Sequence, residues 1–147
     1  MVTHVNKNLY RGSRPLSFAD LQPFGIEHVV NLQSGAYEAA TETQYESEAA
    51  KDFGMVETCV PCSDLFPPSR DAVHRILGII AGGNRVYVHC LHGQDRTGFV
   101  CAAYRMRVCG WSLSDAMREM FQFGFHKVPY LWWAWFLREY AEGTVQR

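Results

Sequence analysis

The segment from His89 to Gly98, with the sequence HCLHGQDRTG, constrains the fold of this chain more than any other. Residues 85–89 before it are predicted to form a buried strand, and residues 97–109 after it a buried helix. A strand, a short loop and a helix N-terminus together form an anion site. The N–H groups of the loop converge on one point, and the helix dipole adds positive potential there. The chain is therefore expected to fold around a loop that holds an anion.

Cys90 and Arg96 lie at the two ends of this loop, with five residues between them. Positive surroundings favour a thiolate, so Cys90 is expected to ionise easily. The planar guanidinium of Arg96 can hold two oxygens of a phosphoryl group at once. The alternative is a buried core cysteine beside an unrelated arginine, but this alternative does not explain the composition of the loop.

The pattern His-Cys-x5-Arg-Thr-Gly resembles the signature of the cysteine-dependent phosphatases, the superfamily of protein tyrosine and dual-specificity phosphatases. Residues 10–15 (YRGSRP) and 25–32 (GIEHVVNL) are similar to the opening of small atypical dual-specificity phosphatases. The resemblance therefore covers most of the chain. It implies a phosphoric monoester hydrolase that works through a phosphocysteine and needs no metal ion or cofactor.

Carried over residue by residue, the resemblance assigns roles within the loop. Cys90 would attack phosphorus, and Thr97 would give a hydrogen bond to its thiolate and help it leave. His89 would orient the loop through hydrogen bonds. Gly93 would let the backbone approach the phosphate without a Cβ atom in the way. The predicted phosphate-binding residues are Leu91, His92, Gly93, Gln94, Asp95 and Arg96, which would act mainly through backbone N–H groups and the Arg96 side chain.

A leaving alkoxide or phenoxide needs a proton from a general acid outside the loop. Asp64 is the predicted acid, because it follows the expected strand at residues 56–60 and precedes Pro67 and Pro68, which stiffen the connection. Asp-x-x-Pro-Pro is similar to the acid loop of the tensin-like phosphoinositide phosphatases. Asp64 could instead only cap a turn, in which case Asp71 is the reserve acid. Asp71 is expected in the first turn of the following helix, where a negative charge is favourable.

Asp95 is unusual, because a carboxylate beside a phosphate site is unfavourable unless it points away or pairs with a base. Gly-x-Asp-Arg-Thr resembles phosphatases that act on phosphoinositides and inositol phosphates, so the expected substrates are inositol polyphosphates, as for the cysteine phytases. The loop has no lysine, which argues against this substrate, although a partly charged His92 could substitute. The alternatives are a phosphotyrosine or dual-specificity protein phosphatase and a phosphoinositide phosphatase. A non-catalytic phosphate-binding module and a rhodanese-type sulfurtransferase remain as different classes, and neither needs the nucleophile, arginine and acid together.

Substrate contacts outside the loop are predicted from basic residues in expected loops. These residues are Arg14, His126 and Lys127. Ordinary surface charge is the alternative for each of them.

Five cysteines, an odd number, argue against a disulfide framework. Cys101 and Cys109 are expected in the core, on the helix that follows the loop. Cys59 and Cys62 have no second cysteine pair with which to hold structural zinc. Either of them is expected to fill the core or, as in some members of the superfamily, to form a reversible disulfide with Cys90.

The 147 residues are predicted to form a single domain, residues 1–147. The formal net charge of −1 provides no global field that would attract a polyanion, so no nucleic-acid partner is expected. No apolar run is long enough to span a membrane. A monomer is expected, acting on a phosphorylated small molecule or phosphoprotein. The default location is the cytoplasm, with a secreted or periplasmic mature form left open.

The predicted fold class is α/β, with a central, mostly parallel sheet of four to five strands flanked by helices, as in the protein tyrosine phosphatase-like fold. The anion loop is expected at the carboxyl end of a central strand. Strands are expected near the start of residues 8–16 and at 26–32, 56–60 and 85–89. Helices are also expected at residues 18–24, 38–53, 69–81, 113–121 and 130–141. The aromatic residues Trp132, Trp133, Trp135 and Phe136 in the last helix predict core packing, or alternatively a membrane-interface or partner patch.

Overall fold

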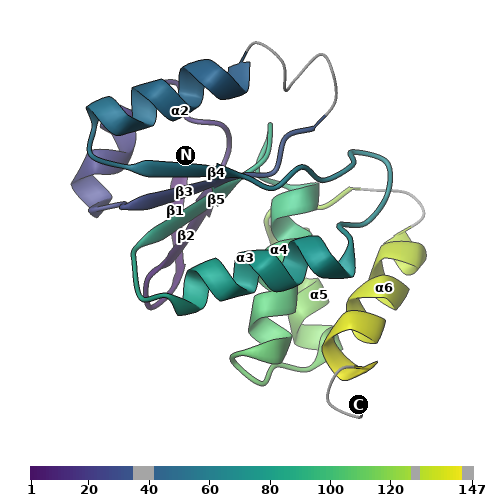
Figure 1. Cartoon of the computed structure of the whole chain (residues 1–147). Helices are drawn as coiled ribbons and strands as arrows, with labels where there is room; N and C mark the ends of the chain where they lie inside the picture. The colour runs from purple at the N-terminus through teal and green to yellow at the C-terminus, as the bar shows by residue number, and fades with distance from the viewer. Residues whose placement is uncertain (35–41, 127–129, 144–147) are drawn as a thin grey trace.

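The computed structural model describes residues 1–34, 42–126 and 130–143 of the chain (Figure 1). Its elements in chain order are β1 (Val2–Asn6), β2 (Leu9–Gly12), the 3-10 helix η1 (Phe18–Phe24), β3 (His28–Asn31), α2 (Glu42–Asp52), β4 (Val56–Cys59), α3 (Arg70–Ala81), β5 (Val86–His89), α4 (Asp95–Arg107), α5 (Leu113–Gln122) and α6 (Tyr130–Gly143).

The strands form one five-stranded sheet in the order β1-β2-β5-β3-β4. β1 pairs antiparallel with β2, and every other pairing is parallel. Parallel strands end at the same edge of a sheet, so the loops after β2, β3, β4 and β5 meet there. β5 is the central strand, which places the loop that follows it in the middle of this edge. The predicted α/β class with a mostly parallel sheet is confirmed.

Helices cover both faces of the sheet, as the continuous hydrophobic runs of its central strands require. Val29 and Tyr87 point to the face that packs against η1 and α2. Val30 and Val88 point to the opposite face, which packs against α3 and α4. Figure 1 shows α5 and α6 beyond α4 on this second side. The anion loop is thus anchored between two hydrophobic layers.

Local hydrogen bonds determine where three of the helices begin. Ser69 begins α3, because its Oγ accepts a hydrogen bond from the N–H of Ala72 at 3.2 Å. Ser112 begins α5 in the same way, with a bond from the N–H of Asp115 at 3.1 Å. α4 begins at Asp95 rather than at residue 97 as predicted, because the N–H of Gly98 donates to the carbonyl of Gln94 and closes the first turn there.

Several other predicted elements differ from those observed by one or more residues at their ends, and β1 (Val2–Asn6) was not predicted. The strand predicted at residues 26–32 is shorter, since β3 comprises only His28–Asn31. The helix predicted at residues 38–53 is observed as α2 from Glu42 to Asp52. The start of that prediction, at residues 38–41, lies outside the described residues.

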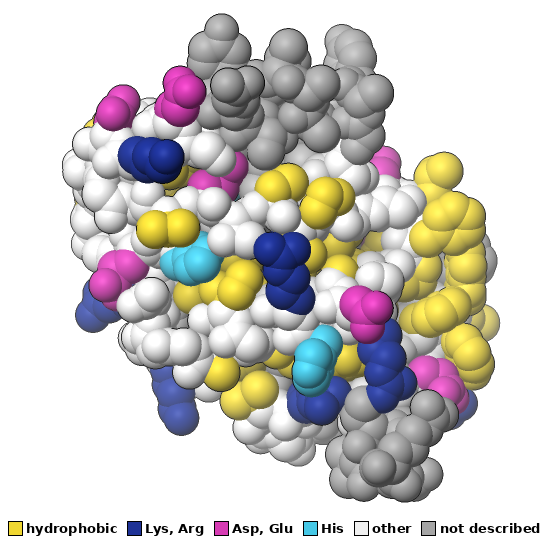
Figure 2. Space-filling view, viewed as in Figure 1, with side chains coloured by type: hydrophobic (Ala, Val, Ile, Leu, Met, Phe, Trp, Pro, Cys, Tyr) yellow, Lys and Arg dark blue, Asp and Glu magenta, His cyan; other side chains and the backbone are white. Residues whose placement is uncertain are grey.

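Helix α6 packs only one of its aromatic stripes into the core. Trp133 is 2% exposed and contacts the rings of Phe99 and Phe125 edge-on, with centroids 5.8 and 5.5 Å away. The prediction of core packing is wrong for Trp132, Trp135 and Phe136, which are exposed because they lie outside the side of the helix that buries Trp133 and Leu137. Figure 2 shows hydrophobic side chains gathered along this edge of the molecule. Within the described ranges, no helix is long and apolar enough to cross a membrane.

We expect Trp133→Ala to lower the free energy of unfolding by about 3–5 kcal/mol, because it leaves a cavity among Phe99, Phe125 and Leu137. Trp135→Ala is the matched control on the same helix, since Trp135 is 49% exposed. This control should change stability by about 1 kcal/mol or less. Urea titration followed by far-UV circular dichroism measures both values, and equal losses would contradict the assigned packing.

Candidate active site

The candidate site is the loop that connects β5 to α4. All four residues of β5 are buried, and its neighbours hold its carboxyl end on both sides. His89 lies opposite Gly12 of β2 and opposite Asn31 of β3. The carbonyl of His89 also accepts a hydrogen bond from the N–H of Leu32 at 2.8 Å. These pairings fix the position of Cys90, which comes next in the chain.

Cys90 lies at the base of the loop and is buried. The hydroxyl of Thr97 donates a hydrogen bond to Cys90 Sγ over 3.1 Å, so the contact expected from the sequence is present. His89 is fully buried, and its Nδ1 lies 3.0 Å from the Cys90 carbonyl oxygen. A carbonyl oxygen only accepts, so Nδ1 carries the proton in this contact. This hydrogen bond joins the end of β5 to the start of the loop, and the orienting role of His89 stays a prediction.

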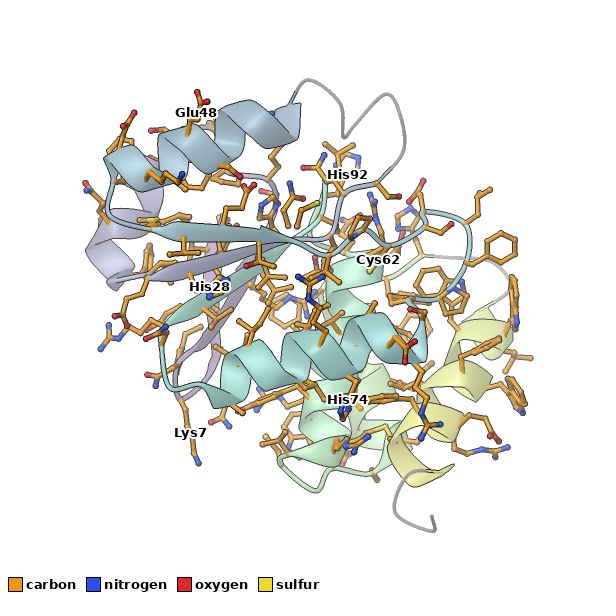
Figure 3. All side chains as sticks on the ribbon, viewed as in Figure 1. Lys7, His28, Glu48, Cys62, His74 and His92 are labelled. Carbon is orange, nitrogen blue, oxygen red and sulfur yellow. The ribbon has the colours of Figure 1, made fainter. Side chains whose placement is uncertain are left out.

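Arg96 is buried in the first turn of α4, with its guanidinium directed toward the loop after β4. Its Nη1 donates to the carbonyl of Cys62 at 3.4 Å, and its Nη2 lies 3.9 Å from Asp64 Oδ1. Ser34 Oγ donates to the same Cys62 carbonyl at 2.7 Å. Figure 3 shows Cys62 and His92 beyond the carboxyl ends of the strands. Segments that follow three different strands thus meet around one arginine.

The acid loop, residues 63–66, presents Asp64 to this arginine. Ser63 Oγ accepts hydrogen bonds from the N–H groups of Leu65 and Phe66 at 3.0 and 3.2 Å, which shapes the loop as a tight turn. The Asp64 side chain is 64% exposed, so water and a substrate can both reach its carboxylate. Asp71, the reserve acid, lies in the first turn of α3 as expected.

The side chain of Asp95 is directed toward the loop that follows α5. It is buried, and its Oδ1 accepts a hydrogen bond from the backbone N–H of His126 at 2.9 Å. The ring Nδ1 of His126 lies 3.3 Å from the same oxygen. Asp95 therefore fastens the loop after α5 to the start of α4. The sequence predicts that Asp95 points away or pairs with a base, but it does not identify His126 as the partner.

The residues predicted to contact substrate outside the loop have different surroundings. The ring of His126 is exposed, but its Nδ1 is directed toward Asp95 and the carbonyl of Gly124. The backbone N–H of Arg14 donates to the Leu91 carbonyl at 3.1 Å, so Arg14 adjoins the loop. The Arg14 side chain lines a hollow of about 320 Å³ beside η1. Lys127 lies outside the described residues.

His92 and Gly93 line a further hollow of about 280 Å³, together with Arg11, Gly12 and Phe123. His92 is exposed on its rim. Gly93 has a φ of +72°, and a Cβ atom there would clash with the Gly12 carbonyl and lie 2.7 Å from the Ser13 nitrogen. Only glycine allows this close approach of the loop to the end of β2.

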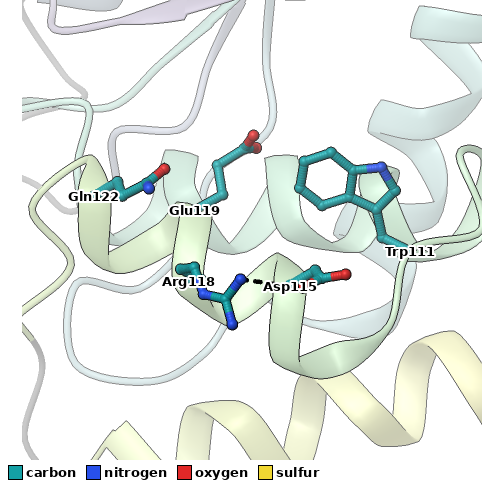
Figure 4. A pocket seen from close by; sticks show the side chains of 5 residues that line it. All are labelled: Trp111, Asp115, Arg118, Glu119 and Gln122. Carbon is teal, nitrogen blue, oxygen red and sulfur yellow. Dashed lines mark hydrogen bonds and ion pairs between the residues drawn. The ribbon is translucent and has the colours of Figure 1, made fainter.

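A separate hollow of about 200 Å³ lies along α5 (Figure 4). Its ionic groups pair with one another or with neighbouring arginines. Arg118 lies 3.5 Å from Asp115, and Glu119 accepts two hydrogen bonds from Arg105 at 3.1 and 3.0 Å. These pairings leave little for a ligand to bind, so the loop after β5 remains the candidate site.

The five cysteines are all free thiols in this structure. Burial raises the pKa of Cys62 to about 12, although the nearby Arg96 acts in the opposite direction. Burial also raises the pKa of Cys101, which is fully enclosed as predicted, whereas Cys109 is only partly buried. Cys62 and Cys101 are therefore neutral near pH 7. A disulfide between Cys90 and either Cys59 or Cys62 stays a prediction.

Comparison with solved structures shows several phosphatases with the same fold. The core catalytic domain of the PP-IP phosphatase SIW14 from S. cerevisiae superposes with a TM-score of 0.81 and 22% identity, covering 99% of this chain and 88% of that one. Tk-PTP in its active form gives 0.75 and 23%, covering 96% of both chains. TpbA of P. aeruginosa in complex with pTyr gives 0.66 and 24%, covering 84% of this chain and 75% of that one.

Comparison of sequences also identifies phosphatases. The dual specificity protein phosphatase TpbA of Pseudomonas aeruginosa is 48% identical over 40 residues, which are 27% of this chain but only 18% of that relative. The family described as dual specificity phosphatase, catalytic domain, matches residues 9–137. The predicted membership of the cysteine-dependent phosphatase superfamily is confirmed: this chain belongs to the family of dual specificity phosphatase catalytic domains.

Proposed function

We propose that this protein is a cysteine-based phosphomonoesterase that forms a phosphocysteine at Cys90. One observation carries the proposal. Cys90 lies at the base of an anion loop, with the Thr97 hydroxyl on its sulfur and the Arg96 guanidinium beside the Asp64 carboxylate. A nucleophile, an anion-binding fork and an acid are the groups that hydrolysis of a phosphate ester through a covalent intermediate requires.

In the first step, the Cys90 thiolate attacks phosphorus and a sulfur–phosphorus bond forms. The bond from phosphorus to the ester oxygen breaks, and that oxygen takes a proton from Asp64. Arg96 and the N–H groups of the loop hold the three equatorial oxygens. Their donors are fixed before the reaction, so they stabilise the charge of the transition state without reorganising.

In the second step, water attacks the phosphocysteine and Asp64 accepts a proton from it. The sulfur–phosphorus bond breaks, inorganic phosphate leaves, and Cys90 returns as a thiolate. The hydrogen bond from Thr97 at 3.1 Å would stabilise the sulfur as negative charge returns to it. This assignment gives Asp64 opposite protonation states in the two steps.

We expect Cys90→Ser to abolish turnover of p-nitrophenyl phosphate while binding of phosphate esters persists, because the anion loop remains intact. Rapid quenching of the wild type followed by mass spectrometry should find one phosphoryl group on the peptide that contains Cys90. Cys109→Ser is the matched control, since Cys109 is partly buried and away from the loop. Unchanged turnover in Cys90→Ser would refute the proposal.

Asp64→Asn should separate substrates by their leaving groups. We expect roughly a 100-fold or larger loss of kcat for an alkyl phosphate, since the alkoxide needs a proton as it departs. The loss should be much smaller for p-nitrophenyl phosphate, whose phenolate leaves without one. Equal losses of kcat for both esters would mean that another residue is the general acid, and Asp71 would be the next candidate.

For the substrate we propose inositol polyphosphates. Arg14 adjoins the loop at Leu91, and His92 and His126 are exposed near it, so one guanidinium and two imidazole rings could meet additional phosphates. The fold shared with the PP-IP phosphatase SIW14 supports this choice. Phosphotyrosine in proteins is the second candidate. Exposed Leu65 and Phe66 beside Asp64 would suit an apolar peptide, and TpbA has been crystallised with pTyr.

We expect a higher kcat/KM for inositol hexakisphosphate than for a phosphotyrosine peptide, measured as phosphate release under reducing conditions. Arg14→Gln should raise KM for the inositol compound roughly tenfold with little change in kcat, because it removes a contact used equally in the ground and transition states. Arg118→Gln is the control, an exposed arginine on α5. Preference for the peptide would favour a protein phosphatase instead.

A further inference from the structure

Arg11 is a buried arginine that supports the anion loop from beneath. It belongs to β2, next to the central strand β5, and is 1% exposed. Its Nη2 donates a hydrogen bond to the carbonyl oxygen of Gly93 at 2.9 Å. Its guanidinium carbon lies 4.2 Å from the centroid of the Phe123 ring. One side chain thus connects β2, the middle of the loop and the end of α5.

This arginine has no carboxylate partner within the described part of the chain, and its Nη1 has no hydrogen-bond partner there. Burying a cation without an anion is unfavourable, and one hydrogen bond and one ring contact offset only part of that cost. Arg105 shows the usual solution, with Glu119 held by two hydrogen bonds and the Val5 carbonyl by a third. An anion bound in the loop would supply Arg11 with the opposite charge that it lacks.

The hydrogen bond from Arg11 also determines which way one peptide group of the loop faces. The peptide bond between Gly93 and Gln94 is planar, and in a trans peptide the carbonyl and the N–H point in opposite directions. Because Arg11 holds the Gly93 oxygen beneath the loop, the N–H of Gln94 is directed toward its inner side. The φ of +72° at Gly93 and its tight packing against Gly12 are compatible with this orientation.

We propose that Arg11 is a positioning residue for phosphate binding. It holds the Gly93 carbonyl away from the anion, so that the N–H of Gln94 donates to a phosphoryl oxygen, and its charge stabilises the anion across the loop. This role rests on the proposed function of the loop as the catalytic phosphate site. It differs from the roles of Cys90, Arg96 and Asp64, because Arg11 acts through the loop and does not touch the substrate.

The test measures kcat and KM for p-nitrophenyl phosphate and the inhibition constant of inorganic phosphate. In Arg11→Met we expect kcat/KM to fall roughly 100-fold, as happens when one oriented donor to an oxyanion is lost. The inhibition constant of phosphate should rise roughly tenfold, as expected for a weakened hydrogen bond to a charged group. Arg11→Lys keeps the charge but lacks the planar fork, so its values should lie between those of Arg11→Met and the wild type.

Arg105→Met is the matched control, because it removes another mostly buried arginine that contacts Val5 and Glu119 instead of the loop. It should lower the midpoint of urea unfolding but leave kcat/KM of the folded protein unchanged. Folded Arg11→Met with kcat/KM and phosphate inhibition within about twofold of the wild type would overturn the proposal. If Arg11→Met does not fold, the same result in Arg11→Lys would overturn it. A wild-type protein that neither hydrolyses the ester nor binds phosphate would instead refute the proposed function.

Discussion

The pairing of β5 with β2 and β3 determines where every residue of the candidate site lies. His89 is held between Gly12 and Asn31, so the chain leaves the sheet at a fixed point and in a fixed direction. A short loop that starts from a rigid strand and ends in a helix has little freedom to change its shape. In the proposed mechanism, the N–H groups of this loop therefore need no reorganisation to bind a phosphoryl group when the substrate arrives. Hydrophobic layers on both faces of the sheet supply this rigidity.

Two carboxylates, Asp95 and Asp64, adjoin the proposed anion site, and they differ in burial and in their partners. Asp95 is enclosed and engaged by His126, which directs its charge toward the loop after α5. Asp64 remains exposed beside Arg96, where a proton can pass between its carboxylate and a departing oxygen or an arriving water. Arg11 and Arg96 approach the loop from opposite sides, one from β2 and the other from α4. The positive charges of Arg11 and Arg96 would attract a bound phosphate and so oppose the repulsion from the negative charge of Asp64.

Local patterns in the sequence were sufficient to predict β5, the loop and α4, because a strand, a glycine-containing turn and a buried helix follow one another without interruption. Asp64 could be proposed because it precedes a recognisable Pro-Pro pair. The tether from Asp95 to His126 and the bond from Arg11 to Gly93 could not be predicted in this way. They join residues that are 31 and 82 positions apart, and hydrophobic periodicity carries no information about such pairs. Arg11 even violates the expected pattern, since a charged residue on a strand is normally taken to face water.

The aromatic residues of α6 show why composition alone did not predict their surroundings. Trp133 packs against Phe99 of α4, so one side of the helix belongs to the core. On its other side, Trp132 meets Phe66 of the acid loop edge-on at 5.3 Å. Trp135 and Phe136 line a hollow of about 380 Å³ together with Pro67 and Pro68, which continue that loop. The exposed face of α6 therefore supports the segment that presents Asp64. This contact between Trp132 and Phe66 therefore helps to hold Asp64 beside Arg96.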